Sequence, residues 1–145
     1  MHIIAAGRRR ALAVAALWAM ALAAPALAQD PRQNEAVAAA RDWLVLLDKH
    51  DVKQLYASSG KRFKEGISEE KWAEVAESGR QQFGAVTQRS LLGAQSPPDT
   101  PNRPKGDFMT VIFRSDFAKR GTGSESLTLE READGKWRVI GYLMK

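Results

Sequence analysis

The chemistry that this sequence could support depends on arginine and carboxylate side chains in its C-terminal half. The arginines that fall in predicted strands are Arg89, Arg114 and Arg138. A guanidinium on a strand can present its donors to an acidic ligand, and with Asp116 or Glu125 it could form the polar part of an enzyme pocket. The simpler interpretation is surface charge, or an ion pair with a carboxylate such as Asp116 or Glu130.

Other side chains with catalytic potential are scarce. The chain has no cysteine, and His50 is its one histidine beyond residue 28. A catalytic histidine needs a nucleophile or carboxylate within hydrogen-bond reach, and no motif supplies one, so we interpret His50 as an exposed residue of a turn or helix end. One histidine without thiolates does not match a conventional zinc site. We therefore expect no metal and no cofactor.

Aromatic residues offer a second kind of site. They are Trp43, Trp72, Phe83, Phe113, Phe117 and Trp137. Apolar walls with a few polar groups are typical of small-molecule pockets, although Trp43, Trp72 and Phe83 also fall on helical stripes that would pack into a core. The candidate binding residues are Trp72, Arg89, Arg114 and Tyr142.

The N-terminal residues predict export. Arg8, Arg9 and Arg10 precede an apolar run of 14 residues, from Ala11 to Ala24, and Ala26-Leu27-Ala28 follows Pro25. A basic patch, a short apolar core and an A-x-A site are typical of a secretory signal peptide, and a spanning helix would need about 20 apolar residues. We expect residues 1–28 to be removed by cleavage between Ala28 and Gln29. Residues 29–145 then form a single periplasmic or secreted domain.

Removal of the leader changes the charge. Three of the 22 Lys and Arg residues and none of the 17 Asp and Glu residues lie in residues 1–28, so the whole-chain charge of +5 falls to +2. That balance gives no reason to expect nucleic-acid binding, and no membrane association is expected after cleavage. Without cysteines, stability must come from packing.

The first half of the remaining chain predicts helices. Asp30-Pro31 suits a helix start, and apolar residues recur at helical spacing over 31–49. Asp51 can cap a short second helix that Gly60 ends, and Lys61–Gly66 is expected to be a basic, mobile link. Ser68 can cap a third helix, which Gly84 would end.

The second half predicts about four strands. The expected strands are Val86–Leu92, Phe108–Phe117, Ser124–Glu132 and Trp137–Met144. Prolines make residues 95–106 an exposed connection. Asp134-Gly135 indicates a hairpin, and a three-residue turn that bulges at Gly135 would place Leu129 opposite Val139. Ile140, Tyr142 and Met144 would then lie on the other face of the sheet from Leu127, Leu129, Trp137 and Val139.

These elements predict an α+β fold, in which three N-terminal helices cover a curved antiparallel sheet of about four strands. The arrangement is similar to cystatin-like and NTF2-like cones. Several segments also resemble the bacterial family called domain of unknown function 4019. They are Ala39–Leu44, Leu46–Asp48, Trp72, Phe83–Val86, Arg89, Phe113, Phe117, Glu125–Leu129 and Asp134–Tyr142. The family implies no activity for any residue.

A function follows only as a hypothesis. The absence of a catalytic set and the apolar groups on both faces of the last predicted strand favour a non-enzymatic domain that binds a protein partner or a small apolar ligand through the sheet. Its partner would be a second copy or an envelope protein. The alternative is a small cone-pocket enzyme that uses an Arg and carboxylate pair.

Overall fold

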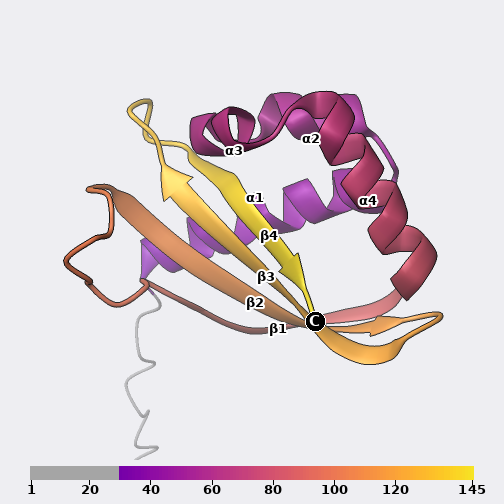
Figure 1. The fold of residues 1–145 in the computed structure, drawn as a ribbon. Coiled ribbons are helices and arrows are strands. Elements are labelled where there is room, and N and C mark those ends of the chain that lie inside the picture. The colour runs from indigo at the N-terminus through magenta and orange to yellow at the C-terminus, as the bar shows by residue number, and fades with distance from the viewer. Residues whose placement is uncertain (1–29) are drawn as a thin grey trace, which may run out of the picture.

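A computed structural model describes residues 30–145, and its chain forms four helices followed by four strands (Figure 1). The helices are α1 (Pro31–Asp48), α2 (Val52–Ser58), α3 (Lys61–Gly66) and α4 (Glu69–Phe83). The strands are β1 (Val86–Gln95), β2 (Asp107–Phe117), β3 (Gly121–Arg131) and β4 (Trp137–Met144). All strands pair with their sequence neighbours in one antiparallel sheet of order β1-β2-β3-β4. The predicted α+β class, with N-terminal helices covering a curved antiparallel sheet of four strands, is confirmed.

Local signals determine where α1 begins and where α4 begins and ends. The Asp30 carboxylate accepts a hydrogen bond from the Arg32 amide at 2.9 Å, ahead of Pro31 in the first turn of α1. Ser68 caps α4 by accepting from the amide of Lys71, and Gly84 ends that helix with φ at +78°. These caps confirm the helix boundaries expected from side chains that favour N-caps and from glycine at helix ends.

The segment Lys61–Gly66 was expected to be a mobile link, and that prediction is wrong because it forms α3. Phe63 provides the physical reason. Its ring is buried and lies 5.1 Å from the ring of Trp72 and 6.1 Å from that of Trp43. Burial of this aromatic ring stabilises a short helix whose basic side chains would not form one alone. The structure thus has four N-terminal helices instead of three.

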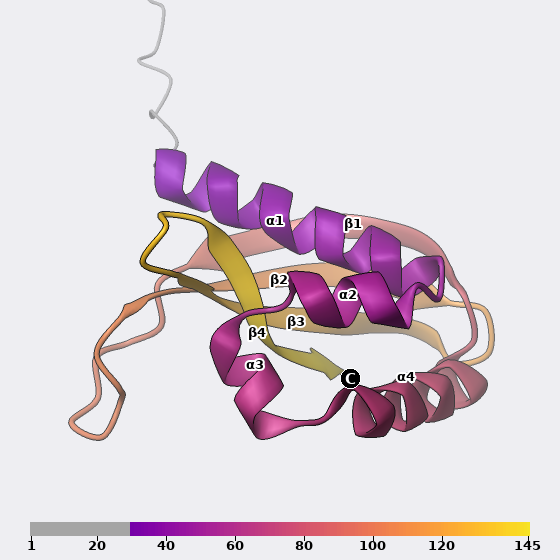
Figure 2. The same cartoon turned by 90° about the horizontal axis from the view of Figure 1, so that it is seen from above.

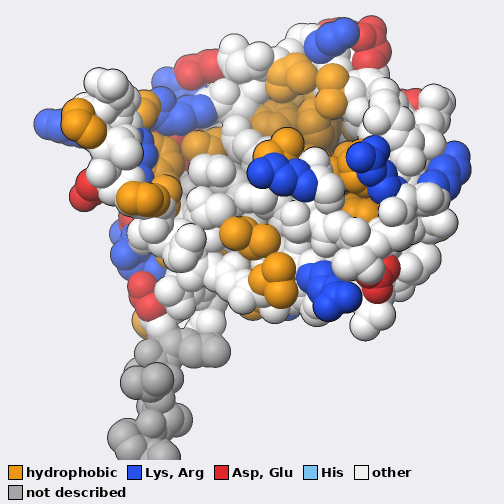
Figure 3. All heavy atoms as spheres, turned by 60° about the horizontal axis from the view of Figure 1, so that its bottom comes forward, with side chains coloured by type: hydrophobic (Ala, Val, Ile, Leu, Met, Phe, Trp, Pro, Cys, Tyr) orange, Lys and Arg blue, Asp and Glu red, His pale blue; other side chains and the backbone are white. Residues whose placement is uncertain are grey.

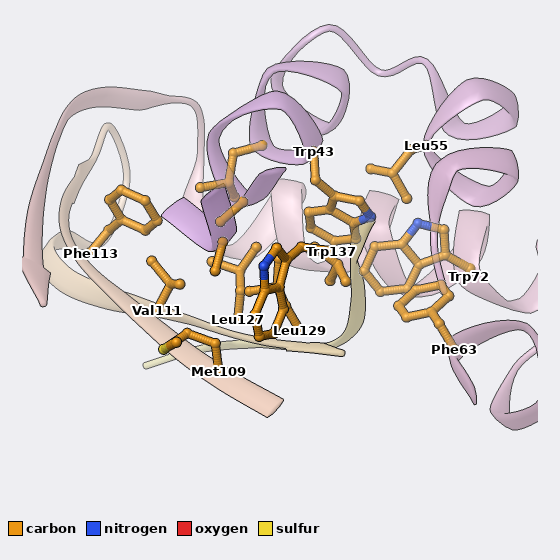
Figure 4. Close-up of a cluster of buried hydrophobic side chains, with 14 residues drawn as sticks. Trp43, Leu55, Phe63, Trp72, Met109, Val111, Phe113, Leu127, Leu129 and Trp137 are labelled. Carbon is orange, nitrogen blue, oxygen red and sulfur yellow. The ribbon is translucent and has the colours of Figure 1, made fainter. Parts of the chain in front are cut away.

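All four helices lie on one side of the sheet, and α1 crosses the whole sheet so that it contacts every strand (Figures 1 and 2). The hydrophobic core fills the space between the two layers (Figure 4). Its main members are Ala36, Ala40, Trp43, Leu44, Leu55, Phe63, Trp72, Met109, Val111, Phe113, Leu127, Leu129, Trp137 and Val139. No helix within residues 30–145 has both the length and the apolar character that a membrane crossing requires.

The hairpin between β3 and β4 has the expected turn. Leu129 pairs with Val139, and Gly135 adopts φ of +81°, a left-handed value that glycine accepts without strain. Trp137 and Val139 are buried with Leu127 and Leu129, as predicted.

The expected placement of Tyr142 and Met144 on the other face is wrong. The register shifts after the pair Leu129 and Val139, so that Tyr142 pairs with Leu127 and Met144 with Glu125. Ile140 is the extra residue at this bulge, and it lies against Gly60, where an added Cβ would come within 2.7 Å of its Cγ2. A bulge moves every later side chain of a strand to the opposite face. Tyr142 and Met144 therefore lie on the helix side.

Candidate functional site

A cavity of about 720 Å³ lies between α4 and the sheet. The backbone of α4 runs close to that of α2 and approaches the strands at few points, and the cavity lies between α4 and the C-terminal end of β4. At one point the two elements do meet, because Gly79 has no side chain and the Met144 methyl group lies against it. The C-terminal end of α1 and the start of β1 complete the walls.

The cavity walls are largely apolar. The apolar lining residues include Leu46, Leu47, Val52, Leu55, Trp72, Val75, Ala76, Phe83, Val86, Phe117 and Met144. Most of these residues lie on helices, and the sheet contributes Val86, Phe117 and the C-terminal end of β4. Walls of this kind with a few convergent polar groups are what small-molecule sites offer.

Glu125 on β3 is the centre of a polar network at the bottom of the cavity, where its side chain is 0% exposed. One carboxylate oxygen accepts from Arg89 Nε at 2.7 Å and from Ser115 Oγ at 2.5 Å. The other accepts from Tyr142 OH at 2.6 Å and from Arg89 Nη2 at 3.2 Å. A carboxylate has about four lone-pair positions, so these four donors satisfy Glu125 completely.

Asp48, the last residue of α1, extends this network to the cavity wall. Its two oxygens accept from Arg89 Nη1 at 2.8 Å and from Nη2 at 3.1 Å. The Arg89 side chain is 14% exposed and that of Asp48 is 43% exposed. One guanidinium thus faces two carboxylates, and the three groups together carry one net negative charge.

The network shifts two pKa values. Burial disfavours the charge of Arg89, but the hydrogen bonds and charges of Asp48 and Glu125 outweigh this effect and raise the pKa of its guanidinium. Burial raises the pKa of Tyr142 far above its usual value, and the nearby charge of Glu125 adds to that effect. Both shifts hold Arg89 charged and Tyr142 neutral, which are the states in which they donate to Glu125.

His50, Glu77 and Arg80 lie at the rim of the cavity. Arg80 Nη1 lies 2.9 Å from His50 Nδ1, and His50 has φ of +60° just after α1. The expected position of His50 in an exposed turn is confirmed.

The structure brings together three of the four candidate binding residues. Arg89 and Tyr142 meet at Glu125, and Trp72 lines the same cavity, where its buried indole N–H donates no hydrogen bond among the residues described. Arg114 is exposed on the opposite face of the sheet, in register with Ser90 and Ser124. The proposed cleavage pair, Ala28 and Gln29, lies outside residues 30–145.

Two further acidic residues, Asp116 and Asp48, also lie on opposite sides of the sheet, and only Asp48 is part of the network. Asp116 alternates with the buried Ser115 and accepts a hydrogen bond from Thr122 on the face away from the cavity. Asp48 belongs to the network, although sequence reasoning gave it no role. Its position two residues before His50 carries no motif, and only the packing of α1 across β1 brings it to Arg89.

Among the residues described, no three His, Cys, Asp or Glu side chains are placed to hold a metal ion.

Comparison with known proteins gives a family and a fold. The sequence model of a family described as "Protein of unknown function (DUF4019)" matches residues 39–142. A search of curated proteins finds no match. The crystal structure of the helical cell shape determining protein Pgp2 from Campylobacter jejuni matches with a TM-score of 0.50 and 14% identity, over 74% of this chain. The match spans 39% of that chain, so the likeness concerns the fold of one part of it.

A second solved structure, of a Campylobacter jejuni protein described as an NTF2-like transpeptidase, matches with a TM-score of 0.43 and 16% identity. That match covers 69% of this chain and 92% of the other.

Proposed function

The chain belongs to the DUF4019 family of proteins of unknown function, and we propose that it is a non-enzymatic domain that binds a small, largely apolar molecule in the cavity between α4 and the sheet. The observation that carries this proposal is the cavity of about 720 Å³, with apolar walls and one polar network at its bottom. Pockets of about 300–1,000 Å³ accommodate typical small ligands.

The polar network supports binding better than catalysis. A general acid or base must exchange a proton with a bound molecule, and for that it needs a free lone pair or a proton to give. Glu125 already accepts four hydrogen bonds from Arg89, Ser115 and Tyr142. These contacts fix the carboxylate in place and leave no lone pair directed at a ligand. The enzyme alternative would require the network to open before Glu125 could act.

The sheet supports a protein partner less well. The two-sided apolar last strand was the reason to expect one, and the bulge at Ile140 removes that reason. Figure 3 shows the molecule turned so that the bottom of Figure 1 comes forward. Hydrophobic side chains gather there in one hollowed group in the upper middle of the view, and over the rest of this face they form small spots among polar atoms. Leu92 and Leu143 are exposed. Interaction surfaces usually form larger continuous apolar patches.

The proposal places this binding domain outside the cytosol, in the periplasm or secreted. It rests on the leader over residues 1–28. Export is tested by the intact mass of the protein recovered from cells, which should correspond to a chain that starts at Gln29. A mass that includes residues 1–28 would contradict export without affecting the cavity.

Binding in the cavity is tested by a bulky substitution on its wall. Val75 on α4 lines the cavity and is 45% exposed, so a tryptophan can fit there without disturbing the core. We expect Val75→Trp to weaken binding of a neutral apolar fluorophore, 1-N-phenylnaphthylamine, by about tenfold, which corresponds to about 1.4 kcal/mol. Fluorescence titration measures the effect.

The control is Val45→Trp on α1. Val45 has the same 45% exposure but does not line the cavity, so this variant adds the same chromophore and should bind like the wild type. Circular dichroism melting curves verify that both variants fold. Equal affinities in the two variants, or no binding to the wild type, would contradict the proposed function.

A further inference from the structure

We propose that the molecule bound in this cavity is a cationic amphiphile, with an apolar body against α4 and an ammonium or amidinium group beside Asp48. This inference rests on the proposed function and adds the chemical class of the ligand. It follows from the charges around the cavity, from the lone pairs left free by the network and from the aromatic rings in the walls.

The charge at the bottom of the cavity is negative. Within residues 30–145, Arg89 is the one cation that forms ion pairs with Asp48 and Glu125, at 2.8 Å and 2.7 Å respectively. Its positive charge neutralises one carboxylate, and no other Lys or Arg of that part of the chain forms an ion pair with the second. Attraction between unlike charges is several times stronger at such a partly buried site than in bulk water. An anionic ligand would be repelled there.

The negative charge that Arg89 does not neutralise can be reached by a ligand at Asp48. Glu125 is fully buried and fully hydrogen-bonded, so it cannot contact a ligand. Each oxygen of Asp48 accepts one hydrogen bond from Arg89 and keeps a second lone pair. The Asp48 side chain is 43% exposed and lines the cavity. A ligand N–H group can therefore donate to Asp48 without breaking the network.

The rim does not reverse this preference. Glu77 and Arg80 are the other charged side chains that line the cavity, and their charges are opposite. A guanidinium can only donate, so the contact of 2.9 Å requires Nδ1 of His50 to accept a hydrogen bond from Arg80. The net charge of the lining, counted with Arg89, thus remains negative.

Aromatic rings in the walls of the same cavity favour a cation further. Trp72 and Tyr142 line the cavity with their ring centroids 6.3 Å apart, and Phe83 and Phe117 form a second pair at 5.0 Å. The faces of aromatic rings attract ammonium and guanidinium groups, and tryptophan does so most strongly. The alkyl part of the same ligand would fill the apolar space between α4 and the sheet.

The test compares ligands that share one alkyl chain and differ in charge: decylammonium, decanol and decanoate. Isothermal titration calorimetry on residues 29–145 at low salt, below the critical micelle concentrations, should show that decylammonium binds about tenfold more tightly than decanol. Decanoate should bind most weakly. Added salt should reduce the preference for the cation, because it screens exposed charges.

Asp48→Asn should remove the preference, because it eliminates the uncompensated charge and leaves the pair of Arg89 and Glu125 in place. Asp42→Asn is the matched control, since Asp42 is an exposed residue of the same helix that does not line the cavity. The inference would be overturned if decanoate bound as tightly as decylammonium, or if the preference for the cation persisted in Asp48→Asn or at high salt. In either case the cavity would still be a binding site. No binding of any of the three ligands would overturn the proposed function as well.

Discussion

Replacing Glu125 by alanine is expected to lower the free energy of unfolding by about 3 kcal/mol, because removing one member of a buried charge network leaves its partners unpaired. Arg89 would lose two hydrogen bonds, and Ser115 and Tyr142 would each lose one. Asp48 still pairs with the guanidinium, so the penalty should fall at the lower end of the range for broken buried pairs, about 3–5 kcal/mol. Urea denaturation followed by circular dichroism measures the change.

A matched control lies on the same strand. Glu130 pairs with Arg62 at 2.9 Å, but it lies on the other face of β3, and the side chains are 42% exposed for Arg62 and 15% exposed for Glu130, against 14% for Arg89 and 0% for Glu125. An ion pair in contact with water contributes about 0–1 kcal/mol, so Glu130→Ala should have at most a third of the effect of Glu125→Ala. Equal losses in the two variants would show that the network at Glu125 does not stabilise the fold more than a surface pair does.

The sequence predicted those parts of the fold that depend on neighbouring residues. Asp30, Ser68 and Gly84 mark helix ends because caps act within one turn, and they do so whatever packs nearby. The alternation of Glu125 with Leu127 and Leu129 likewise indicated a strand with one buried face. The same alternation could have identified Glu125 as a buried carboxylate, since it occupies an inward position of that strand.

Other features depend on contacts between distant residues. The helix α3 forms because Phe63 packs against Trp43 and Trp72, which no local pattern in a basic segment reveals. The bulge at Ile140 lies beside Gly60, about eighty residues earlier, whose amide donates to the carbonyl of Val139 at 2.8 Å. Prediction of the side-chain faces of β4 from alternation alone therefore failed after that residue.

In the candidate site, too, residue types could be predicted from the sequence, whereas their contacts depend on the tertiary structure. Arg89 and Tyr142 could be named from residue type and strand position, but their meeting at Glu125 depends on the registers of three strand pairs. Arg114 has the same residue type as Arg89 and faces the other way. It pairs with Ser90, one position along β1 from Arg89, so the position of each arginine in its strand determines which of them reaches Glu125. Residue type identified the chemistry, and tertiary structure selected the residues that share it.

Trp43→Ala is expected to destabilise the protein by about 3–5 kcal/mol, as is typical when a large buried aromatic side chain is truncated. Trp43 lies where α1, the short helices and the sheet meet (Figure 4), and its ring contacts those of Phe63, Trp72 and Tyr142. Its indole N–H also donates to Ser59 Oγ at 2.8 Å. The free energy of unfolding from urea titration measures the loss.

Two milder variants separate packing from hydrogen bonding at Trp43. Trp43→Phe keeps a ring but loses the donor, and Ser59→Ala leaves the buried N–H without an acceptor, so each should cost about 1–3 kcal/mol. The double variant should cost less than the sum, because neither partner is then left unsatisfied. Strict additivity would show that the hydrogen bond between Trp43 and Ser59 contributes nothing to stability.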